Sequence, residues 1–321
     1  MLTIAYIGNY RHSHCTECHV SKTLQSLGCD VIQYQEDQYS AEQILASLPP
    51  STDLILWSRT WGLRDKGGEM IIRAAPCVTA ALSLDLYVGL ERQTWIDEHP
   101  WWRSTHVFTA DGGHEEFWKQ RGINHHWLPA AVYDKECYLA EPIEKYSADV
   151  AFVGVTRSYH REWPYRMRLL EWLRSQYGTR FLKIGFPLVS IRNNELNELY
   201  ASVKIAIGDT LCLGFQHPNY WSDRVYETTG RGGFIIHPFV PGMEKHFENG
   251  RHLVFYQYGN FEQLRELIDY YLKHDDEREK IRLAGHLHTR TNHTYRHRMR
   301  ELLATVFPGL EIHREGIETL R

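Results

Sequence analysis

Residues 221–237 read WSDRVYETTGRGGFIIH, and this stretch decides the fold class. Its polar start and the glycine-free run after it predict a helix of one or two turns. The glycines at 230, 232 and 233 predict a tight turn, and the apolar run Gly233–His237 predicts a buried strand. A helix that leads through a turn into a buried strand is the repeating unit of parallel α/β sheets.

The same alternation of strands and helices extends through the rest of the chain. Toward the N-terminus, strands are predicted at Leu2–Gly8, Asp30–Tyr34, Asp53–Ser58, Cys77–Leu84, His106–Ala110 and near His126–Leu128, with helices at Ala41–Leu48 and Glu115–Gln120. Toward the C-terminus, strands are predicted at Asp149–Gly154, Phe181–Gly185, Lys204–Gly208 and Gly233–His237, and helices at Arg166–Gln176, Phe261–Lys273, Asp276–Leu287 and Tyr295–Val306. This pattern predicts an α/β protein with two doubly wound, Rossmann-like domains.

An irregular polar stretch, Asp134–Ser147, separates the two runs of alternation and is the expected linker. We therefore predict an N-terminal domain over residues 1–147 and a C-terminal domain over residues 148–321. The last helix of the second domain is expected to be able to cross back to the first. A chain of 321 residues is long enough for two such domains.

Composition excludes several classes of protein. The net charge of −4 argues against a general binder of nucleic-acid backbones, which usually carries a basic excess. No stretch reaches the roughly 18 apolar residues of a membrane helix, and the N-terminus lacks the basic start of a signal peptide. The six scattered cysteines are expected to be free thiols. These features predict a cytoplasmic protein.

Two charged residues in the opening stretch point to phosphate and ribose binding. Arg224 and Glu227 are three apart and share a helix face, and Ser222 is placed to cap the helix. A guanidinium group can hold a phosphate in a fork, and a carboxylate can accept hydrogen bonds from both ribose hydroxyls. An ordinary ion pair between Arg224 and Glu227 on a solvated face is an equally good interpretation of the spacing.

Several short motifs recur here in the order and spacing of a known family. They are Arg224–Glu227 (RVYE), Gly230–Phe234 (GRGGF), Pro241–Glu244 (PGME), Asn249–Val254 (NGRHLV) and His293–His297 (HTYRH). The run from Tyr220 to Leu303 resembles the donor-binding domain of GT-B glycosyltransferases, and more closely the "glycosyl transferases group 1" (CgeB-type) proteins of bacteria and phages. The resemblance implies two Rossmann-like domains that face a cleft.

The resemblance also implies roles for individual residues. Glu227 matches the glutamate that grips the donor ribose, and Arg224 and Tyr226 lie in the same matched run. Many retaining relatives carry another glutamate eight residues earlier, where this chain has Asn219. The donor sugar and the stereochemistry of transfer therefore stay open.

A second matching segment is the strand end and loop Phe152–Pro164, which reads FVGVTRSYHREWP. Ligands of open parallel sheets sit beyond the carboxyl ends of the strands. Arg157 and Arg161 are therefore candidates to neutralise a leaving diphosphate, although two arginines in a loop can equally be surface residues.

The N-terminal half of a GT-B enzyme usually takes the acceptor. Gly8 and Asn9 follow the first strand, and we count them with the donor-binding candidates. Asp85 follows the fourth strand and is the candidate catalytic base of an inverting enzyme. In a retaining enzyme Asp85 would instead orient the sugar, and a cap on a helix or turn is an equally good structural role for it.

The segment Cys15-x-x-Cys18-His19 has the spacing of a haem attachment site and of half a zinc site. Haem attachment needs export, and no second Cys-x-x-Cys pair completes four zinc ligands, so we predict no metal site and no obligatory cofactor. Histidines of a loop near the acceptor are the preferred interpretation.

These observations predict a glycosyltransferase that moves a hexosyl or pentosyl group from a UDP- or GDP-linked donor to an acceptor hydroxyl. The acceptor could be a small molecule, a glycan, a protein or modified DNA, and a strip of Arg59, Trp61, Arg64 and Lys66 could face DNA. Three alternatives stay open: a phage-type transferase for DNA bases, an epimerase or hydrolase acting on nucleotide sugars, and a non-enzymatic protein that binds nucleotide sugars or metal.

Overall fold

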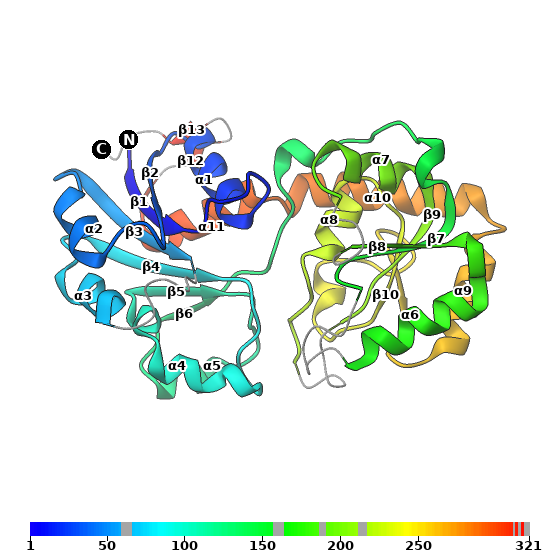
Figure 1. Cartoon of the computed structure of the whole chain (residues 1–321), viewed down its shortest axis with the longest axis horizontal. Helices are drawn as coiled ribbons and strands as arrows, with labels where there is room; N and C mark the ends of the chain where they lie inside the picture. Colours follow the sequence, from blue (N-terminus) through cyan, green and yellow to red (C-terminus); the bar gives the residue numbers. More distant parts are fainter. Residues whose placement is uncertain are drawn as a thin grey trace. The chain divides into compact units, whose positions relative to one another are not determined.

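The computed structural model describes residues 1–58, 66–156, 164–185, 191–210, 217–310, 312–313 and 316–317. The chain forms two compact units. The first consists of Met1–Pro129 and Tyr295–Arg321, and the second of Ala130–Thr294 (Figure 1). This division falls earlier in the chain than the predicted boundary between residues 147 and 148, and it places the last helix with the N-terminal unit.

The segment that we expected to be a linker is held in the second unit by its own contacts. The backbone amide of Ile143 donates a hydrogen bond to the Ser202 hydroxyl, at 2.7 Å. The side-chain amide of Asn197 donates hydrogen bonds to the carbonyl oxygens of Glu136 and Tyr138, at 2.8 and 2.9 Å. A polar, irregular sequence therefore does not mark a free linker here, because its backbone is bonded by the neighbouring elements.

The first unit contains a parallel six-stranded sheet in the order β2-β1-β3-β4-β5-β6. The strands are β1 (Thr3–Gly8), β2 (Asp30–Gln35), β3 (Thr52–Ser58), β4 (Val78–Ser83), β5 (His106–Thr109) and β6 (His125–Trp127). The helices are α1 (Thr16–Ser26), α2 (Ala41–Ser47), α3 (Lys66–Ala74), α4 (Trp95–Glu98), α5 (Glu115–Gln120) and α11 (Tyr295–Val306). A short antiparallel pair, β12 (Ile312–His313) and β13 (Gly316–Ile317), follows α11.

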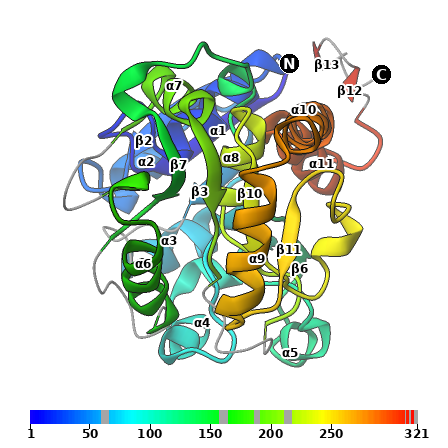
Figure 2. The same cartoon turned by 90° about the vertical axis from the view of Figure 1, so that its right-hand side faces the viewer.

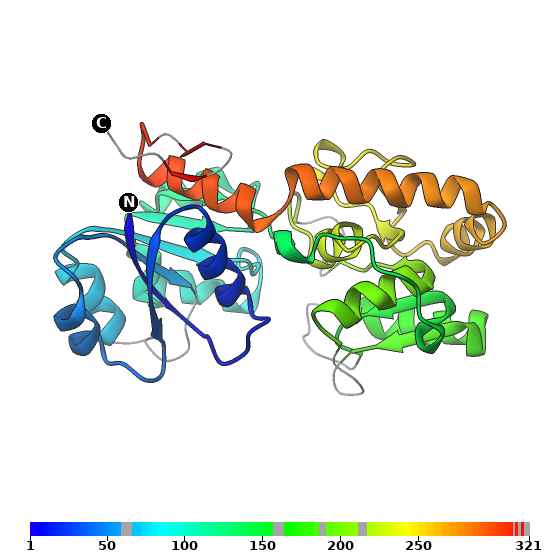
Figure 3. The ribbon, with the colours of Figure 1, turned by 90° about the horizontal axis from the view of Figure 1, so that it is seen from above.

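Helices cover both faces of this sheet. One face packs against α2, α3, α4 and α5 through an aromatic core that includes Trp101, Trp102 and Trp118. On the other face α11 lies beside α1, although the two are far apart in the sequence (Figures 1 and 3). The last helix therefore completes the layer that α1 begins.

The second unit contains a parallel five-stranded sheet in the order β11-β10-β9-β7-β8. The strands are β7 (Ala148–Val153), β8 (Phe181–Ile184), β9 (Val203–Ile207), β10 (Ile235–Pro238) and β11 (Val254–Tyr256). The helices are α6 (Pro164–Tyr177), α7 (Asn194–Ser202), α8 (Arg224–Gly230), α9 (Phe261–Tyr271) and α10 (Asp275–Asn292).

Each face of the second sheet has its own core. Helices α6 and α9 pack on one face, around Leu169, Leu173, Leu264 and Ile268. Helix α7 packs on the opposite face through Leu196 and Leu199, among others. Figures 1 and 2 show α6 and α9 together on one side of the strands and α7 on the other. Both units are thus doubly wound, as the sequence predicts.

The strand orders fix where ligands can sit. In such a sheet, the crevice lies between two neighbouring strands whose connections run to opposite faces. In the second unit this switch point lies between β7 and β9, and in the first unit between β1 and β3. Among the described residues, no helix is long and apolar enough to cross a membrane.

Acid is expected to weaken the fold through histidines that are buried uncharged. Burial, with the charges of His126 and His114, lowers the pKa of His125 from 6.5 to about 3. Its ring stacks on Trp118 at 4.3 Å, and its Nε2 lies 2.8 Å from the Thr109 hydroxyl. The pKa of His125 is lower in the folded protein than in the unfolded chain. The free energy of unfolding therefore stays constant with respect to this group above pH 6.5 and falls below it, by up to about 1.4 kcal/mol per pH unit.

The test compares unfolding free energies from urea titrations between pH 7 and pH 4.5. We expect the His125→Phe variant to lose less stability than the wild type over this range, because phenylalanine keeps the stacking and takes up no proton. The exposed His12 provides the control, since His12→Phe is expected to follow the wild type at every pH. An equal dependence on pH in wild type and His125→Phe would contradict this prediction.

Candidate functional site

A buried charge cluster lies at the switch point of the second unit, where β7 and β9 end. Asp209 follows β9 and is fully buried. The guanidinium group of Arg166 binds it in a fork, with Nε 2.6 Å from Oδ2 and Nη2 3.3 Å from Oδ1. The Nη1 atom of Arg224 also donates to Oδ1. Two arginines therefore share one carboxylate, and the cluster carries a net charge of +1.

The backbone and an aromatic ring hold Arg224 in place. Its Nε donates to the carbonyl oxygen of Val153, at 2.6 Å, and its guanidinium carbon lies 4.8 Å from the centre of the Phe152 ring. A Cβ atom on Gly154 would lie 2.5 Å from Nη2, and Gly154 has φ 153°, so glycine is needed at this strand end. The side chain of Arg224 stays 11% exposed.

Electrostatics keep Asp209 ionised. Burial alone would raise the pKa of its carboxyl group, but Arg224 and Arg166 together hold that pKa below its ordinary value. With Asp209 ionised, one of the two positive charges of Arg166 and Arg224 is not neutralised within the cluster. A cluster of this kind, at the carboxyl edge of a parallel sheet, is suited to bind an anionic group such as a phosphate.

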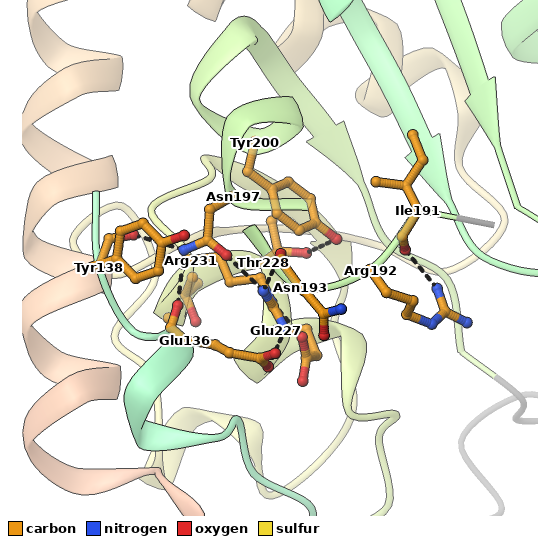
Figure 4. Close-up of polar contacts among 12 residues, drawn as sticks. Glu136, Tyr138, Ile191, Arg192, Asn193, Asn197, Tyr200, Glu227, Thr228 and Arg231 are labelled. Carbon is orange, nitrogen blue, oxygen red and sulfur yellow. Dashed lines mark hydrogen bonds and ion pairs between the residues drawn. The ribbon is translucent and has the colours of Figure 1, made fainter. Parts of the chain in front are cut away.

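Glu227 belongs to a second network, centred on Arg231 (Figure 4). The Nε atom of Arg231 donates to Oε2 of Glu227 at 2.6 Å, and its Nη2 donates to Glu136. Its Nη1 donates to Oδ1 of Asn197 at 2.5 Å and to the carbonyl oxygen of Asn193 at 3.0 Å. One buried guanidinium group thus joins α7, α8 and the segment before β7.

This network orients the Glu227 carboxylate. Among the described residues, no hydrogen bond is formed by its other oxygen, Oε1, and 22% of the side chain is exposed. Burial raises the pKa of Glu227, whereas the charge of Arg231 opposes that rise. The arrangement presents a fixed acceptor at the surface, which is what binding a pair of hydroxyl groups requires.

Arg224 and Glu227 do not pair with each other, so the interpretation of their spacing as an intrahelical ion pair is wrong. Arg224 binds Asp209 and Glu227 binds Arg231. Neither residue therefore has the partner that the three-residue spacing suggested. Each side chain is thus held by a different network. Because Arg224 and Glu227 both lie in the first turn of α8, the two networks meet there.

The prediction that Ser222 caps α8 is also wrong. Asp223 occupies the N-cap position with helical backbone angles, and no side chain of the described residues caps the helix. The Ser222 hydroxyl is buried and makes no hydrogen bond among the described residues. Since α8 has only seven residues, we place no anion site at its N-terminus.

The structure gives Tyr226 a packing role. Its side chain is fully buried, and its hydroxyl accepts a hydrogen bond of 2.9 Å from Nε1 of Trp221. Its ring packs near those of Phe247 and His293. A side chain without exposed surface cannot touch a donor, and we therefore remove Tyr226 from the donor-binding candidates.

Asn219 lies eight residues before Glu227, and its backbone explains why asparagine suits this position. It adopts φ 62°, a left-handed conformation that asparagine tolerates better than most residues. Its amide nitrogen donates to the carbonyl oxygen of Pro241 at 2.8 Å. Arg157 and Arg161, the two loop candidates, lie outside the described residues.

The remaining candidates lie in the first unit. Gly8 ends β1, Asn9 follows it, and Asp85 follows β4 on the wall of a pocket of about 240 Å³. Of the residues that we considered for a DNA-facing strip, Arg59, Trp61 and Arg64 lie outside the described residues, and Lys66 begins α3.

The Cys-x-x-Cys-His segment has a structural role at the start of α1. Cys15 is the N-cap residue: its sulfur accepts from the amide of Cys18 at 3.4 Å and donates to the carbonyl oxygen of Asn9 at 3.0 Å. Within the described ranges, no group of three or more histidine, cysteine, aspartate or glutamate side chains is placed to hold a metal ion.

Sequence reasoning missed several residues of these clusters, among them Glu136, Arg166, Asp209 and Arg231. Asp209 directly follows a predicted strand, so the rule that ligands sit at strand ends could have found it. Arg231 is four residues after Glu227, a spacing that favours an ion pair on a helix.

Comparison with known proteins identifies the family. The sequence model of the glycosyl transferase-like family matches residues 141–304, just over half of the chain. The chain belongs to this family. It is a glycosyltransferase, and the matched region contains all residues of the two charge clusters except Glu136. No curated protein matches the chain.

Solved structures similar to this glycosyltransferase share its fold along nearly the whole chain. Sucrose-phosphate synthase from Thermosynechococcus elongatus aligns with a TM-score of 0.64 and 11% identity, over 96% of this chain and 99% of its own. HepE from Anabaena in complex with UDP-glucose aligns with a TM-score of 0.63 and 9% identity, over 95% and 99%. An α-glucosyltransferase in complex with UDP-glucose and DNA containing an abasic site aligns with 0.64 and 8%, over 95% and 99%. The predicted GT-B fold class is confirmed.

Proposed function

We propose that this glycosyltransferase moves a sugar from a UDP- or GDP-linked donor to an acceptor hydroxyl. The observation that carries the proposal is the pair of networks at the start of α8. One presents the Oε1 atom of Glu227, and the other presents the cationic edge formed by Arg224, Arg166 and Asp209. The complexes of HepE with UDP-glucose support a uridine nucleotide as the first donor to test.

Each network has a part in the proposed reaction. Glu227 accepts hydrogen bonds from the donor ribose through Oε1, while Arg231 keeps the carboxylate in one orientation. The exposed edge of Arg224 faces the diphosphate. When the bond between the sugar and the diphosphate breaks, negative charge builds up on the leaving oxygen, and a fixed guanidinium group stabilises it most strongly at that point.

The loop residues Arg157 and Arg161 are proposed to add positive charge around the same diphosphate, and Gly8 and Asn9 stay in the proposal as lesser donor contacts. Ser222 is left out because its hydroxyl is buried. Asp85 is proposed to act on the acceptor side. If transfer inverts the configuration at the anomeric carbon, Asp85 accepts the proton of the acceptor hydroxyl. If transfer retains that configuration, a phosphate oxygen of the leaving group accepts the proton and Asp85 orients the sugar.

Nucleoside diphosphates are expected to stabilise the wild type. A ligand at 100 times its Kd adds about 2.7 kcal/mol to the free energy of unfolding, which is readily seen as a rise in Tm. We expect UDP or GDP to raise the Tm of the wild type. Glu227→Gln should reduce that rise strongly, because a neutral amide forms weaker hydrogen bonds with the ribose hydroxyls than a carboxylate does.

Each variant is measured with and without nucleotide, so a change in its own stability does not enter the comparison. Glu266→Gln is the matched control, since Glu266 is exposed on α9 of the same unit. It should keep the full rise. If neither UDP nor GDP changes the Tm of the wild type, the proposed function is wrong.

A further inference from the structure

A pocket of about 510 Å³ opens in the second unit at the carboxyl ends of β10 and β11, where Phe239 and Gln257 directly follow the two strands. Its volume lies within the range of about 300–1,000 Å³ that is usual for sites of small molecules. Ligands of parallel sheets sit beyond this end of the strands. The lining shares no residue with the two charge clusters described above, so the pocket is a separate candidate site.

Two phenylalanine rings form an aromatic corner in this pocket. The register of β10 and β11 places His237 beside Phe255. Phe239 lies two residues beyond His237, and its side chain is therefore on the same face of the sheet as that of Phe255. The two half-buried rings lie 5.4 Å apart, with an angle of 76° between their planes. They offer a ligand two apolar surfaces that stand nearly perpendicular to each other.

Two amide side chains of the lining are fixed through their oxygen atoms. The backbone amide of Phe255 donates to Oδ1 of Asn249, and that of Gln257 donates to Oε1 of Gln263, each at 2.7 Å. Because a backbone N–H can bond only to the oxygen of a side-chain amide, these contacts determine how each amide is turned. Neither NH2 group forms a hydrogen bond among the described residues. Both are therefore available as donors to a ligand.

A carboxylate of the lining adds an acceptor to these donors. The backbone amide of Gly242 donates to Oε2 of Glu244 at 2.8 Å, and Oε1 accepts no hydrogen bond within the part of the chain that the structure describes. The other carboxylate of the lining, Glu248, is paired with Arg251 at 2.9 Å, whereas Glu244 forms no ion pair with a described residue. One negative charge is thus left without a partner, which favours a neutral ligand over an anion.

Carbohydrate rings match this combination of groups. A sugar ring carries C–H groups on its faces, which pack against aromatic rings, and hydroxyl groups around its edge, which donate and accept hydrogen bonds. We propose that this pocket is a second glycan site, which binds neutral sugar rings of an oligosaccharide apart from the donor clusters. The inference goes beyond the proposed function, because such binding requires neither a nucleotide nor the transfer of a sugar.

The test measures the binding of trisaccharides to the full chain without nucleotide, by isothermal titration calorimetry and saturation-transfer NMR. The probes are maltotriose, cellotriose, mannotriose and triacetylchitotriose. We expect at least one of them to bind with a Kd of about 1 mM or lower. In the NMR spectra, the strongest transfer is expected at C–H protons of the ring that packs against the aromatic corner.

Variants tie the binding to the pocket. Phe255→Leu keeps an apolar side chain but removes the flat ring, and it should raise the Kd at least about tenfold, whereas Phe255→Tyr should stay within about threefold of the wild type. Gln263→Glu keeps the oxygen that the backbone amide of Gln257 needs but loses the NH2 donor, and it should raise the Kd at least about fivefold. Tyr270→Leu removes an exposed ring from α9 of the same unit and is the control, with an unchanged Kd.

The outcomes separate this inference from the proposed function. If no trisaccharide binds, or if Phe255→Leu and Gln263→Glu both bind as tightly as the wild type, the glycan site is wrong. It is also wrong if Phe255→Leu abolishes the rise in Tm caused by UDP or GDP, because the pocket then holds the nucleobase, and the proposed function stands. If trisaccharide binding responds to the variants as expected while no nucleotide binds the wild type, the glycan site stands and the proposed function fails.

Discussion

An Arg231→Met variant is expected to lose about 3–5 kcal/mol of unfolding free energy. Arg231 is only 3% exposed, and it is the shared partner of Glu136 and Glu227. Methionine fills a similar volume but leaves two carboxylates in a poorly hydrated site without their cation. Removing one partner from a buried ion pair costs far more than the pair itself contributes, because the remaining charge has lost its compensation.

Urea unfolding at pH 7 measures this loss, and lower pH provides a second test. In the variant, burial raises the pKa of Glu227 without the opposing charge of Arg231, so protonation of Glu227 stabilises the folded form. The deficit relative to the wild type should therefore shrink as the pH falls from 7 toward 5. Arg265→Met, which breaks an exposed pair with Glu262, should cost less than about 1 kcal/mol. A deficit of that small size in Arg231→Met would contradict the prediction.

The fold was predictable because its signals are local. Strands such as Asp53–Ser58 are short apolar runs between turn residues, and the predicted and observed positions agree closely. Two elements of the second unit were missed, α7 and β11. Helix α7 begins at Asn194 in a polar run that resembles a loop, and β11 has only three residues, Val254–Tyr256. Whether these two segments form a helix and a strand depends on tertiary packing more than on the local sequence pattern.

The candidate site was less predictable, because its geometry depends on residues that are distant in the sequence. The spacing of Arg224 and Glu227 indicated the right helix but the wrong partners. Asp209 directly follows β9 and lies 15 residues before Arg224, with no motif that links the two, and only the fold brings them together.

An Asp209→Asn variant is the second change with a large expected effect, again about 3–5 kcal/mol of unfolding free energy. The amide keeps the shape of the side chain, but the guanidinium groups of Arg166 and Arg224 lose the carboxylate that they share. Asp149→Asn is the matched control, since Asp149 forms ion pairs with Arg180 and Lys204 at a partly exposed position of the same unit. It should cost less than about 1 kcal/mol.

The same variant also tests where the diphosphate binds. With Asp209 neutral, the cluster carries +2 instead of +1, and an anionic ligand can supply the missing charge. We therefore expect UDP or GDP to raise the Tm of Asp209→Asn more than that of the wild type, and added salt to reduce this difference. If the variant loses stability but gains no more from nucleotide than the wild type does, then the cluster only supports the fold. In that case the diphosphate contacts must come from other residues, and the role proposed for Arg224 is wrong.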